Sequence, residues 1–505
     1  MTQELQADPV LGRLADSVLI PPFPGAREPG WVRAALTGGL AGVTLYGPNV
    51  EDNNQLAALT ARLRSAAAEP VIAIDEEGGD VTRISHQDGS DYPGNAALGA
   101  IDDVELTRSV YAALGADLAA LGINLNLAPA VDVNTAAGNP VIGTRSFGAD
   151  PDLVARHGAA AVAGMQSAGV AACAKHFPGH GSTMQDSHLV LATVDAPLSV
   201  LAARDLPPFE AAIAAGVRAI MPSHLRVPEL TGELPASLSR RAQTDLLRGE
   251  LGFTGVIVSD GLEMQAVSER YGIPEAAVLA VMAGTDLLCL GREQDQLSFL
   301  AVKSALLEAV RSGRLRGERL EEAAARVAGL RAWMAAVAPV AGSPAAAGVT
   351  AADPIGLAAA RRAISVSGTL PPPSQPLVVQ FVPPSNLAAG TVPWGLRPYL
   401  PAGSYREVST GTPPASLADV VAGIVAEADG RTLIVVVRDA HRHPAAAAAA
   451  ELMLAARPDA VVVEMGLPVW RPDSANGWHG SYVATYGAAR SNSRAAAEVL
   501  SLTAP

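Results

Sequence analysis

The chain has 505 residues, of which 49% are hydrophobic and 17% charged, so it suits two or three domains with sizeable buried cores. Its net charge of −14 argues against binding to nucleic acid or to an anionic membrane, because their phosphate groups would repel it. Only two cysteines are present, and no apolar run reaches the roughly 18–20 residues of a membrane-spanning helix. The N-terminal segment lacks the apolar stretch of a signal peptide. Together these features favour a cytoplasmic protein.

Residues 1–337 alternate short apolar runs with alanine-rich helical stretches. The apolar runs are continuous rather than alternating, which is typical of parallel strands that are buried on both faces. Eight such runs occur, at 17–23, 41–47, 70–75, 123–133, 169–175, 218–224, 255–261 and 285–291. Helical periodicity between them, for instance at 54–68, 105–121 and 152–169, predicts a (β/α)8 TIM-like barrel. A doubly wound open sheet is the alternative, but no G-x-G-x-x-G motif follows the first run.

The rest of the chain predicts a second domain. An amphipathic helix at 317–334 closes the barrel half, and residues 338–354, rich in Ala, Gly and Pro, predict a linker. Residues 355–505 contain four further apolar runs with helical stretches between them, at 376–381, 432–437, 460–466 and 481–487. This pattern predicts a smaller α/β domain with a mostly parallel open sheet.

Polar side chains end most apolar runs of the barrel half. These are Asp75, Asp132, Lys175 with His176, His224 and Asp260. In a barrel the carboxyl ends of the strands converge on one face, so the sequence predicts a shared pocket there. For any single residue, the alternative is a strand end that simply meets solvent.

The densest group of ionisable residues is 175–188, KHFPGHGSTMQDSH. Within it, Asp186 and His188 are two residues apart. A carboxylate beside an imidazole fixes its tautomer and raises its basicity, which suits a general acid/base. A metal site formed by His176, His180, Asp186 and His188 is an alternative, but the spacing matches no zinc motif. We therefore predict no metal and no cofactor.

Asp260 lies in VIVSDGLEM, directly after a predicted buried strand and before a glycine. A carboxylate in this place can approach a ligand closely and serve as a nucleophile, a base or a metal ligand. The alternative is a helix N-cap for the segment that follows, because aspartate is a preferred residue there.

Four motifs occur in order along the barrel half: DEEGG with a following Arg, GTRSFG, KHFPGHG followed by DSH, and SDGLEM. Together they resemble glycoside hydrolase family 3, and most closely its bacterial β-N-acetylglucosaminidases with a His–Asp acid/base dyad. The resemblance covers roughly residues 10–340, and the C-terminal part resembles the accessory α/β domain of longer members more loosely. One departure is Asp80, which stands where the family usually has Arg.

The resemblance implies a retaining exo-β-N-acetylglucosaminidase that removes terminal β-linked N-acetylglucosamine from peptidoglycan or chitin fragments through a covalent glycosyl-enzyme. Asp260 corresponds to the nucleophile, His188 to the general acid/base and Asp186 to its partner. Five residues correspond to positions that bind the sugar: Asp75, Arg83, Arg145, Lys175 and His176. The partner expected is a small oligosaccharide, with no nucleic acid or membrane, for a monomer or homodimer.

Three other functions are weighed. A β-N-acetylglucosaminide phosphorylase is compatible with a histidine base, which is uncharged and would not repel phosphate. A β-glucosidase of the same family is also open, because no residue by itself demands an acetamido group. A non-catalytic sugar-binding protein is disfavoured, since it would need neither a nucleophile nor a dyad. We expect no catalytic group from the second domain, whose histidines are His441, His443 and His479.

Overall fold

The computed structural model describes residues 8–337, 354–384, 390–411 and 414–502. Its contacts divide the chain into two compact units. The first comprises Met1–Glu77, Thr107–Val141 and Ala149–Thr350, and the second comprises Gly78–Leu106, Ile142–Gly148 and Ala351–Pro505. The predicted linker at 338–354 lies outside the described residues except for Pro354, so the predicted division into 1–337 and 355–505 stays a prediction.

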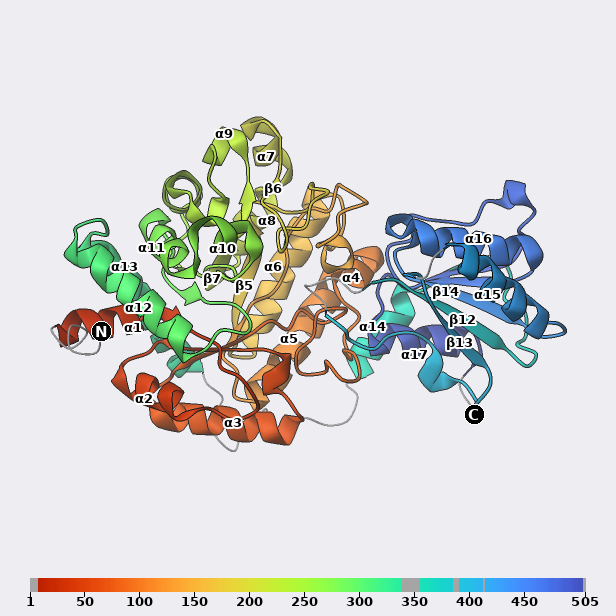
Figure 1. The fold of residues 1–505 in the computed structure, drawn as a ribbon, viewed down its shortest axis with the longest axis horizontal. Coiled ribbons are helices and arrows are strands. Elements are labelled where there is room, and N and C mark those ends of the chain that lie inside the picture. Colours follow the sequence, from red (N-terminus) through yellow and green to blue (C-terminus); the bar gives the residue numbers. More distant parts are fainter. Residues whose placement is uncertain (1–7, 338–353, 385–389, 412–413, 503–505) are drawn as a thin grey trace. The chain divides into compact units, whose positions relative to one another are not determined.

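The first unit is built on eight parallel strands, and all eight predicted strands are confirmed (Figure 1). Six of them form one sheet in the order β2-β3-β4-β5-β7-β9, and β1 pairs with β10. A parallel bridge between Val258 and Leu287 connects β9 to β10, and Thr44 N donates to Pro21 O between β2 and β1. The strands are β1 (Leu19–Ile20), β2 (Gly42–Leu45), β3 (Val71–Ile74), β4 (Leu125–Asn126), β5 (Ala171–Phe177), β7 (Ala219–Pro222), β9 (Val256–Ile257) and β10 (Leu288–Cys289).

The inner faces of these strands form one apolar core. Residues two apart on a strand, such as Val71 and Ala73 or Ala171 and Cys173, point into it, as strand geometry requires. Helix α13 (Gly317–Val337), which was predicted at 317–334, adds Val327, Leu330 and Met334 to this core. Arg331 of α13 donates to Ala68 O and, at 2.9 Å, to Glu69 O just before β3, so α13 packs at the amino end of this strand.

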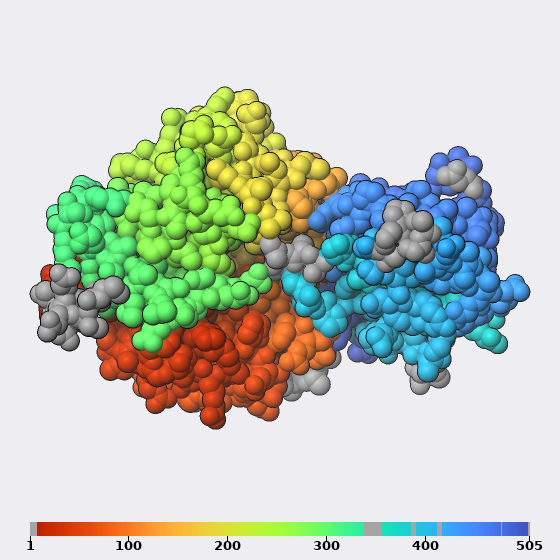
Figure 2. All heavy atoms as spheres, in the orientation of Figure 1, coloured from red at the N-terminus to blue at the C-terminus, as the bar shows by residue number. Residues whose placement is uncertain are grey.

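Helices surround the strands, as the order of elements predicts. Several begin at an aspartate whose side chain accepts from backbone N–H groups of the first turn, as Asp52, Asp150 and Asp295 do. Helices α1 and α12 pack together, so red and green residues adjoin on the surface (Figure 2). The helices are α1 (Pro9–Asp16), α2 (Gly30–Gly38), α3 (Asn53–Ala66), α5 (Val104–Ala120), α6 (Pro151–Ser167), α7 (Leu198–Arg204), α8 (Pro207–Ala214), α9 (Pro228–Thr231), η5 (Arg241–Glu250), α10 (Gln265–Tyr271), α11 (Ile273–Ala283) and α12 (Gln296–Arg311).

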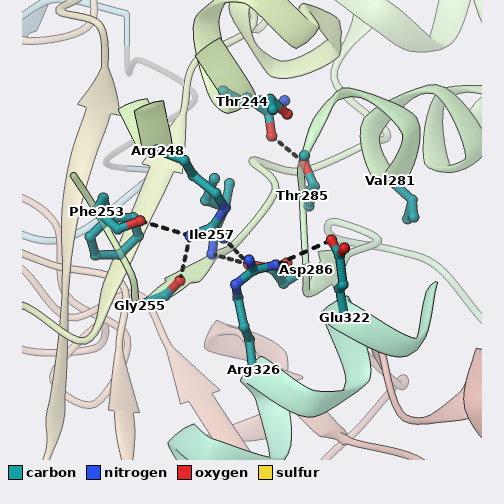
Figure 3. A network of polar contacts seen from close by, with 12 residues as sticks. Thr244, Arg248, Phe253, Gly255, Ile257, Val281, Thr285, Asp286, Glu322 and Arg326 are labelled. Atoms are coloured by element: carbon teal, nitrogen blue, oxygen red, sulfur yellow. Dashed lines mark hydrogen bonds and ion pairs between the residues drawn. The ribbon is translucent and has the colours of Figure 1, made fainter. Parts of the chain in front are cut away.

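A buried charge network lies at the amino ends of β9 and β10 (Figure 3). The fully buried carboxylate of Asp286 forms ion pairs with Arg248, with Arg319 at 2.6 Å and with Arg326 at 3.3 Å. It also accepts from Ile257 N at 2.9 Å. Because two of these arginines come from α13, the network fastens that helix to the strands.

The second unit contains a six-stranded sheet in the order β11-β16-β15-β14-β12-β13. Every pair is parallel except β11 with β16, so the predicted mostly parallel open sheet is confirmed. The four predicted strands are present, whereas β11 and β13 were missed. The strands are β11 (Ser365–Ser367), β12 (Leu377–Val382), β13 (Tyr405–Ser409), β14 (Leu433–Val437), β15 (Val461–Glu464) and β16 (Tyr482–Ala484), and the helices are α4 (Asn95–Ile101), α14 (Pro354–Ala363), α15 (Pro414–Glu427), α16 (Pro444–Ala456) and α17 (Arg490–Val499).

Asp80 explains how part of the barrel half of the sequence joins this second unit. Its carboxylate pairs with Arg438 at 3.0 Å and accepts from Thr144 Oγ1 at 2.6 Å and from Ala488 N at 3.1 Å. Only 5% of the Asp80 side chain is exposed. The aspartate that departs from the family pattern therefore connects segments 78–106 and 142–148 to the C-terminal sheet. Within the described ranges, no helix is both long and apolar enough to cross a membrane.

Candidate active site

Lys175 lies near the end of β5, between two carboxylates. Its Nζ atom pairs with Asp75, which follows β3, and lies 2.7 Å from Oε1 of Glu77. The side chains of Lys175 and Glu77 are buried, whereas 21% of the Asp75 side chain is exposed. The structure thus brings together two of the predicted sugar-binding residues, Asp75 and Lys175, and leaves the Asp75 carboxylate accessible to a ligand.

His176 is held by Asp132, which follows β4. Nδ1 of His176 lies 2.8 Å from Oδ2 of Asp132, and the other oxygen accepts from the backbone N–H groups of His176 and His180. Burial alone would raise the pKa of Asp132, but the neighbouring imidazole groups and these hydrogen bonds lower it to about 2. Asp132 is therefore an anion that fixes the orientation of the His176 ring.

The loop after β5 carries the predicted dyad. Nδ1 of His188 lies 2.8 Å from Oδ1 of Asp186, and 21% of the His188 side chain is exposed. Burial would raise the pKa of Asp186, but hydrogen bonds from the ring and backbone of His188 lower it below its usual value. Asp186 is thus ionised at neutral pH and can hold His188 in the tautomer that leaves Nε2 for proton transfer.

Contacts at its base and at its far end hold this loop to the barrel. His180 Nε2 lies 2.8 Å from Ser187 Oγ, and Asn139 Nδ2 donates to His180 O at 2.8 Å. A side chain at Gly181 would collide with the backbone of Val133. Further along, β6 (Ala192–Thr193) pairs with β8 (Leu225–Arg226).

Asp260 follows β9 and is held by a tight turn. Its Oδ1 accepts from Gly261 N at 2.8 Å. Burial would raise the pKa of Asp260, but the imidazole groups of His224, His176 and His188, together with the Gly261 N–H, bring it below its usual value. Helix α10 begins at Gln265 with Met264 at its N-cap, so the alternative role of Asp260 as a helix N-cap is wrong.

His224, at the end of β7, supports the Asp260 turn. Its Nε2 donates to Gly261 O at 2.9 Å, and its Nδ1 lies 2.6 Å from Ser237 Oγ. Burial lowers the pKa of His224, and the neighbouring Asp260 carboxylate opposes this shift.

The dyad loop and the nucleophile turn meet directly. Gln265 N donates to His188 O at 3.3 Å, five residues after Asp260 in the chain. Among the predicted strand ends, Lys175 contacts Asp75, His176 contacts Asp132, and His224 and His176 act electrostatically on Asp260; all six residues belong to the first unit. Arg83 and Arg145 belong to the second unit, and their sugar-binding roles stay predictions.

Asp132 and His224 were predicted only to line the shared pocket and His180 only as an alternative metal ligand, whereas Glu77 and Glu263 had no predicted role. Across the described residues, no three His, Cys, Asp or Glu side chains are grouped as metal ligands. One ring nitrogen of each histidine in the alternative metal set contacts another side chain: His176 contacts Asp132, His180 contacts Ser187 and His188 contacts Asp186.

A parallel eight-stranded α/β barrel with an ionised carboxylate and a His–Asp pair beyond the carboxyl ends of its strands has the architecture of a barrel enzyme. Residues 29–330 match the family model described as the glycosyl hydrolase family 3 N terminal domain. The chain therefore belongs to glycoside hydrolase family 3 and is a glycoside hydrolase, as its motifs predicted.

Relatives and solved structures agree with this assignment. The chain is 36% identical to beta-hexosaminidase A of Pseudoalteromonas piscicida, over 58% of this chain and 53% of that protein, so it spans about half the length of this relative. It is 40% identical to beta-hexosaminidase of Stenotrophomonas maltophilia, over 49% of this chain and 75% of that protein. A family 3 beta-N-acetylglucosaminidase from Paenibacillus superposes with a TM-score of 0.86 at 34% identity, covering 98% of this chain and 97% of that one.

Proposed function

We propose that this glycoside hydrolase is a retaining exo-β-N-acetylglucosaminidase. The observation that carries the proposal is the hydrogen bond from Gln265 N to His188 O, because it joins the loop of an acid/base dyad to the turn of an ionised carboxylate. The names of the relatives support β-linked N-acetylhexosamine as the sugar. The covalent mechanism is proposed from the residues and from the family.

In the first step, the Asp260 carboxylate attacks the anomeric carbon while Nε2–H of His188 protonates the departing glycosidic oxygen. The C–O bond to the leaving group breaks and an ester bond to Asp260 forms. In the second step, His188 Nε2 takes a proton from a water molecule, whose oxygen attacks the anomeric carbon and releases Asp260. Asp186 stabilises the protonated imidazole in the first step.

The sugar subsite is proposed from the buried groups around Lys175. The ammonium group compensates the charges of Asp75 and Glu77, and the accessible Asp75 carboxylate can accept hydrogen bonds from sugar hydroxyl groups. His176, fixed by Asp132, is proposed as a further sugar contact. The proposed roles of Arg83 and Arg145 rest on the family resemblance alone.

We propose small soluble fragments of peptidoglycan or chitin as substrates and the cytoplasm as the compartment. Support for the compartment comes from Cys173 and Cys289, which are both buried free thiols. A monomer or homodimer without nucleic-acid or membrane partners is proposed from the charge of −14.

The test is turnover of an aryl β-N-acetylglucosaminide, with and without phosphate, with the products identified by mass. The proposal expects free N-acetylglucosamine in both cases and at least a 1,000-fold loss of kcat, roughly, in Asp260→Asn. Sugar 1-phosphate as the main product would instead establish a phosphorylase. Preference for an aryl β-glucoside would establish a β-glucosidase, and full activity of Asp260→Asn would refute the assigned nucleophile.

A further inference from the structure

Glu263 is a buried acid three residues after Asp260 that the proposed mechanism does not use. Part of the residue reaches the surface, but its Oε2 atom is buried and has no hydrogen-bond partner among the described residues. Its Oε1 atom accepts from Arg292 N at 2.6 Å. One carboxyl oxygen of Glu263 thus accepts a single backbone hydrogen bond and the other accepts none. A full negative charge on this group would therefore cost considerable free energy.

Two glycines create the space that this carboxyl group fills. A β-carbon at Gly261, next to the nucleophile, or at Gly291, just after β10, would collide with the Glu263 carboxyl group. Gly291 also has a φ of +88°, which other residues rarely adopt. The glycines come from different strand ends, so the carboxyl group fills the space where the Asp260 turn meets the end of β10.

The backbone contacts around Glu263 tie the same two segments together. Leu262 N donates to Cys289 O at 3.2 Å, and Met264 N donates to Gly261 O at 3.1 Å. Ser268 Oγ donates to Glu263 O at 2.8 Å, which connects the turn to α10. The Glu263 side chain adds one more contact between these segments, because its Oε1 atom accepts from Arg292 N.

Burial favours the uncharged form of Glu263. It raises the pKa of Glu263 to about 7 and outweighs the N–H groups of Arg292 and Glu263, which lower this pKa; the anionic Asp260 raises it and the Arg292 charge lowers it by smaller amounts. Tyr46 and Cys289 also face it, and burial raises the pKa of both, so neither supplies a positive charge.

We infer that Glu263 is a positioning residue that, as a neutral carboxylic acid, fastens the turn of the nucleophile Asp260 to the segment after β10. This inference rests on the proposed function, because it concerns the same nucleophile. Ionisation of Glu263 would place a carboxylate oxygen without a donor between two glycines, so the group would move toward water and release the turn. Activity then falls as the pH rises through neutrality for a reason separate from proton transfer by His188.

The experiment separates these two causes by the choice of leaving group. A dinitrophenolate ion departs without a proton, so a 2,4-dinitrophenyl β-N-acetylglucosaminide needs no general acid in the first step. On this substrate, we expect wild-type kcat to fall between pH 6 and pH 9. Glu263→Gln, which is uncharged at every pH, should keep kcat within about threefold of wild type at pH 6 and remove the alkaline fall. Glu263→Ala, which leaves the space beside Gly261 and Gly291 empty, should lower kcat roughly 10- to 100-fold with little change in KM.

An alkaline fall in Glu263→Gln equal to that of wild type would overturn the inference. So would a loss in Glu263→Gln as large as in Glu263→Ala, since a neutral acid would then not be what the turn needs. Either result leaves the proposed function intact as long as wild-type enzyme releases N-acetylglucosamine and Asp260→Asn does not. Failure of the wild-type enzyme to act on any aryl β-N-acetylglucosaminide would refute the proposed function and, with it, this role of Glu263.

Discussion

Nδ1 of His188 lies 2.8 Å from Oδ1 of Asp186, and the same carboxylate oxygen accepts a hydrogen bond from the backbone N–H of His188. One oxygen thus fixes both the ring and the main chain of the histidine. The arrangement sets the tautomer of His188 and places a negative charge beside its ring. In the proposed mechanism, Asp186 therefore acts through His188 rather than on the sugar.

Replacement of Asp186 by Asn should lower kcat by roughly 10- to 1,000-fold, because the amide stabilises neither the tautomer nor the charge of His188. The loss should be largest for aryl glycosides with poor leaving groups, which need the proton most. Steady-state kinetics over a series of leaving groups measures this. Asp195→Asn, an exposed carboxylate further along the same loop, is the matched control and should behave as wild type. Equal losses for all leaving groups would contradict a role in proton transfer.

Lys175 should contribute to stability through the charges that it compensates. Lys175→Met removes the ammonium group that pairs with the buried carboxylate of Glu77 and with Asp75, so the free energy of unfolding should fall by about 3–5 kcal/mol. Adding Glu77→Gln should recover about 1–3 kcal/mol of this loss, because it removes one of the uncompensated charges. Urea denaturation of the two variants measures the difference. A double variant less stable than Lys175→Met alone would contradict this explanation.

Removal of the buried Asp286 carboxylate should lower the free energy of unfolding much more than removal of the exposed Asp245 carboxylate. Asp286→Ala leaves Arg248, Arg319 and Arg326 without their common anion, and we expect a loss of about 3–5 kcal/mol. Asp245→Ala is the control, since its ion pair with Arg240 is exposed on both sides and should contribute about 0–1 kcal/mol. Thermal unfolding by circular dichroism compares the two. Similar losses in both variants would show that the network does not stabilise the barrel.

The pair formed by Asp80 and Arg438 should stabilise the second unit. A double-mutant cycle with Asp80→Asn and Arg438→Met should give a coupling energy of about 1–3 kcal/mol, because 5% of the Asp80 side chain and 18% of the Arg438 side chain are exposed. Hydrogen exchange of residues 78–106 should rise in both single variants. Additive effects in the cycle would contradict a direct interaction.

Glu263 should make stability depend on pH. Burial raises its pKa in the folded protein to about 7, above the ordinary value of 4.5, so the folded protein binds the proton more tightly than the unfolded chain. Its contribution is therefore fully present below about pH 4.5 and is lost as the pH rises through 7, on the order of 1–3 kcal/mol. Unfolding in urea at pH 5 and pH 8 should show a smaller difference in Glu263→Gln than in wild type. An unchanged difference would show that Glu263 does not titrate in this range.

The sequence predicted the barrel well because parallel strands buried on both faces leave continuous apolar runs. It missed β13 (Tyr405–Ser409), an edge strand in which only Val408 is buried, because such a strand has no apolar run. The grouping of segment 78–106 with the second unit has no local signal in the sequence, since it depends on Asp80 meeting Arg438 far along the chain. Glu263 gave no local signal, because the glycine at 291 that makes room for it is distant in sequence.

The most direct test of the central claim is covalent trapping of the nucleophile. Incubation with a 2,4-dinitrophenyl glycoside of a fluorinated N-acetylglucosamine analogue that reacts quickly and hydrolyses slowly should add one sugar per chain. Proteolysis and mass spectrometry should place that sugar on Asp260, in the peptide that contains VSDGLEM. A sugar attached to another residue, or turnover of the normal substrate with no label on Asp260, would contradict the account.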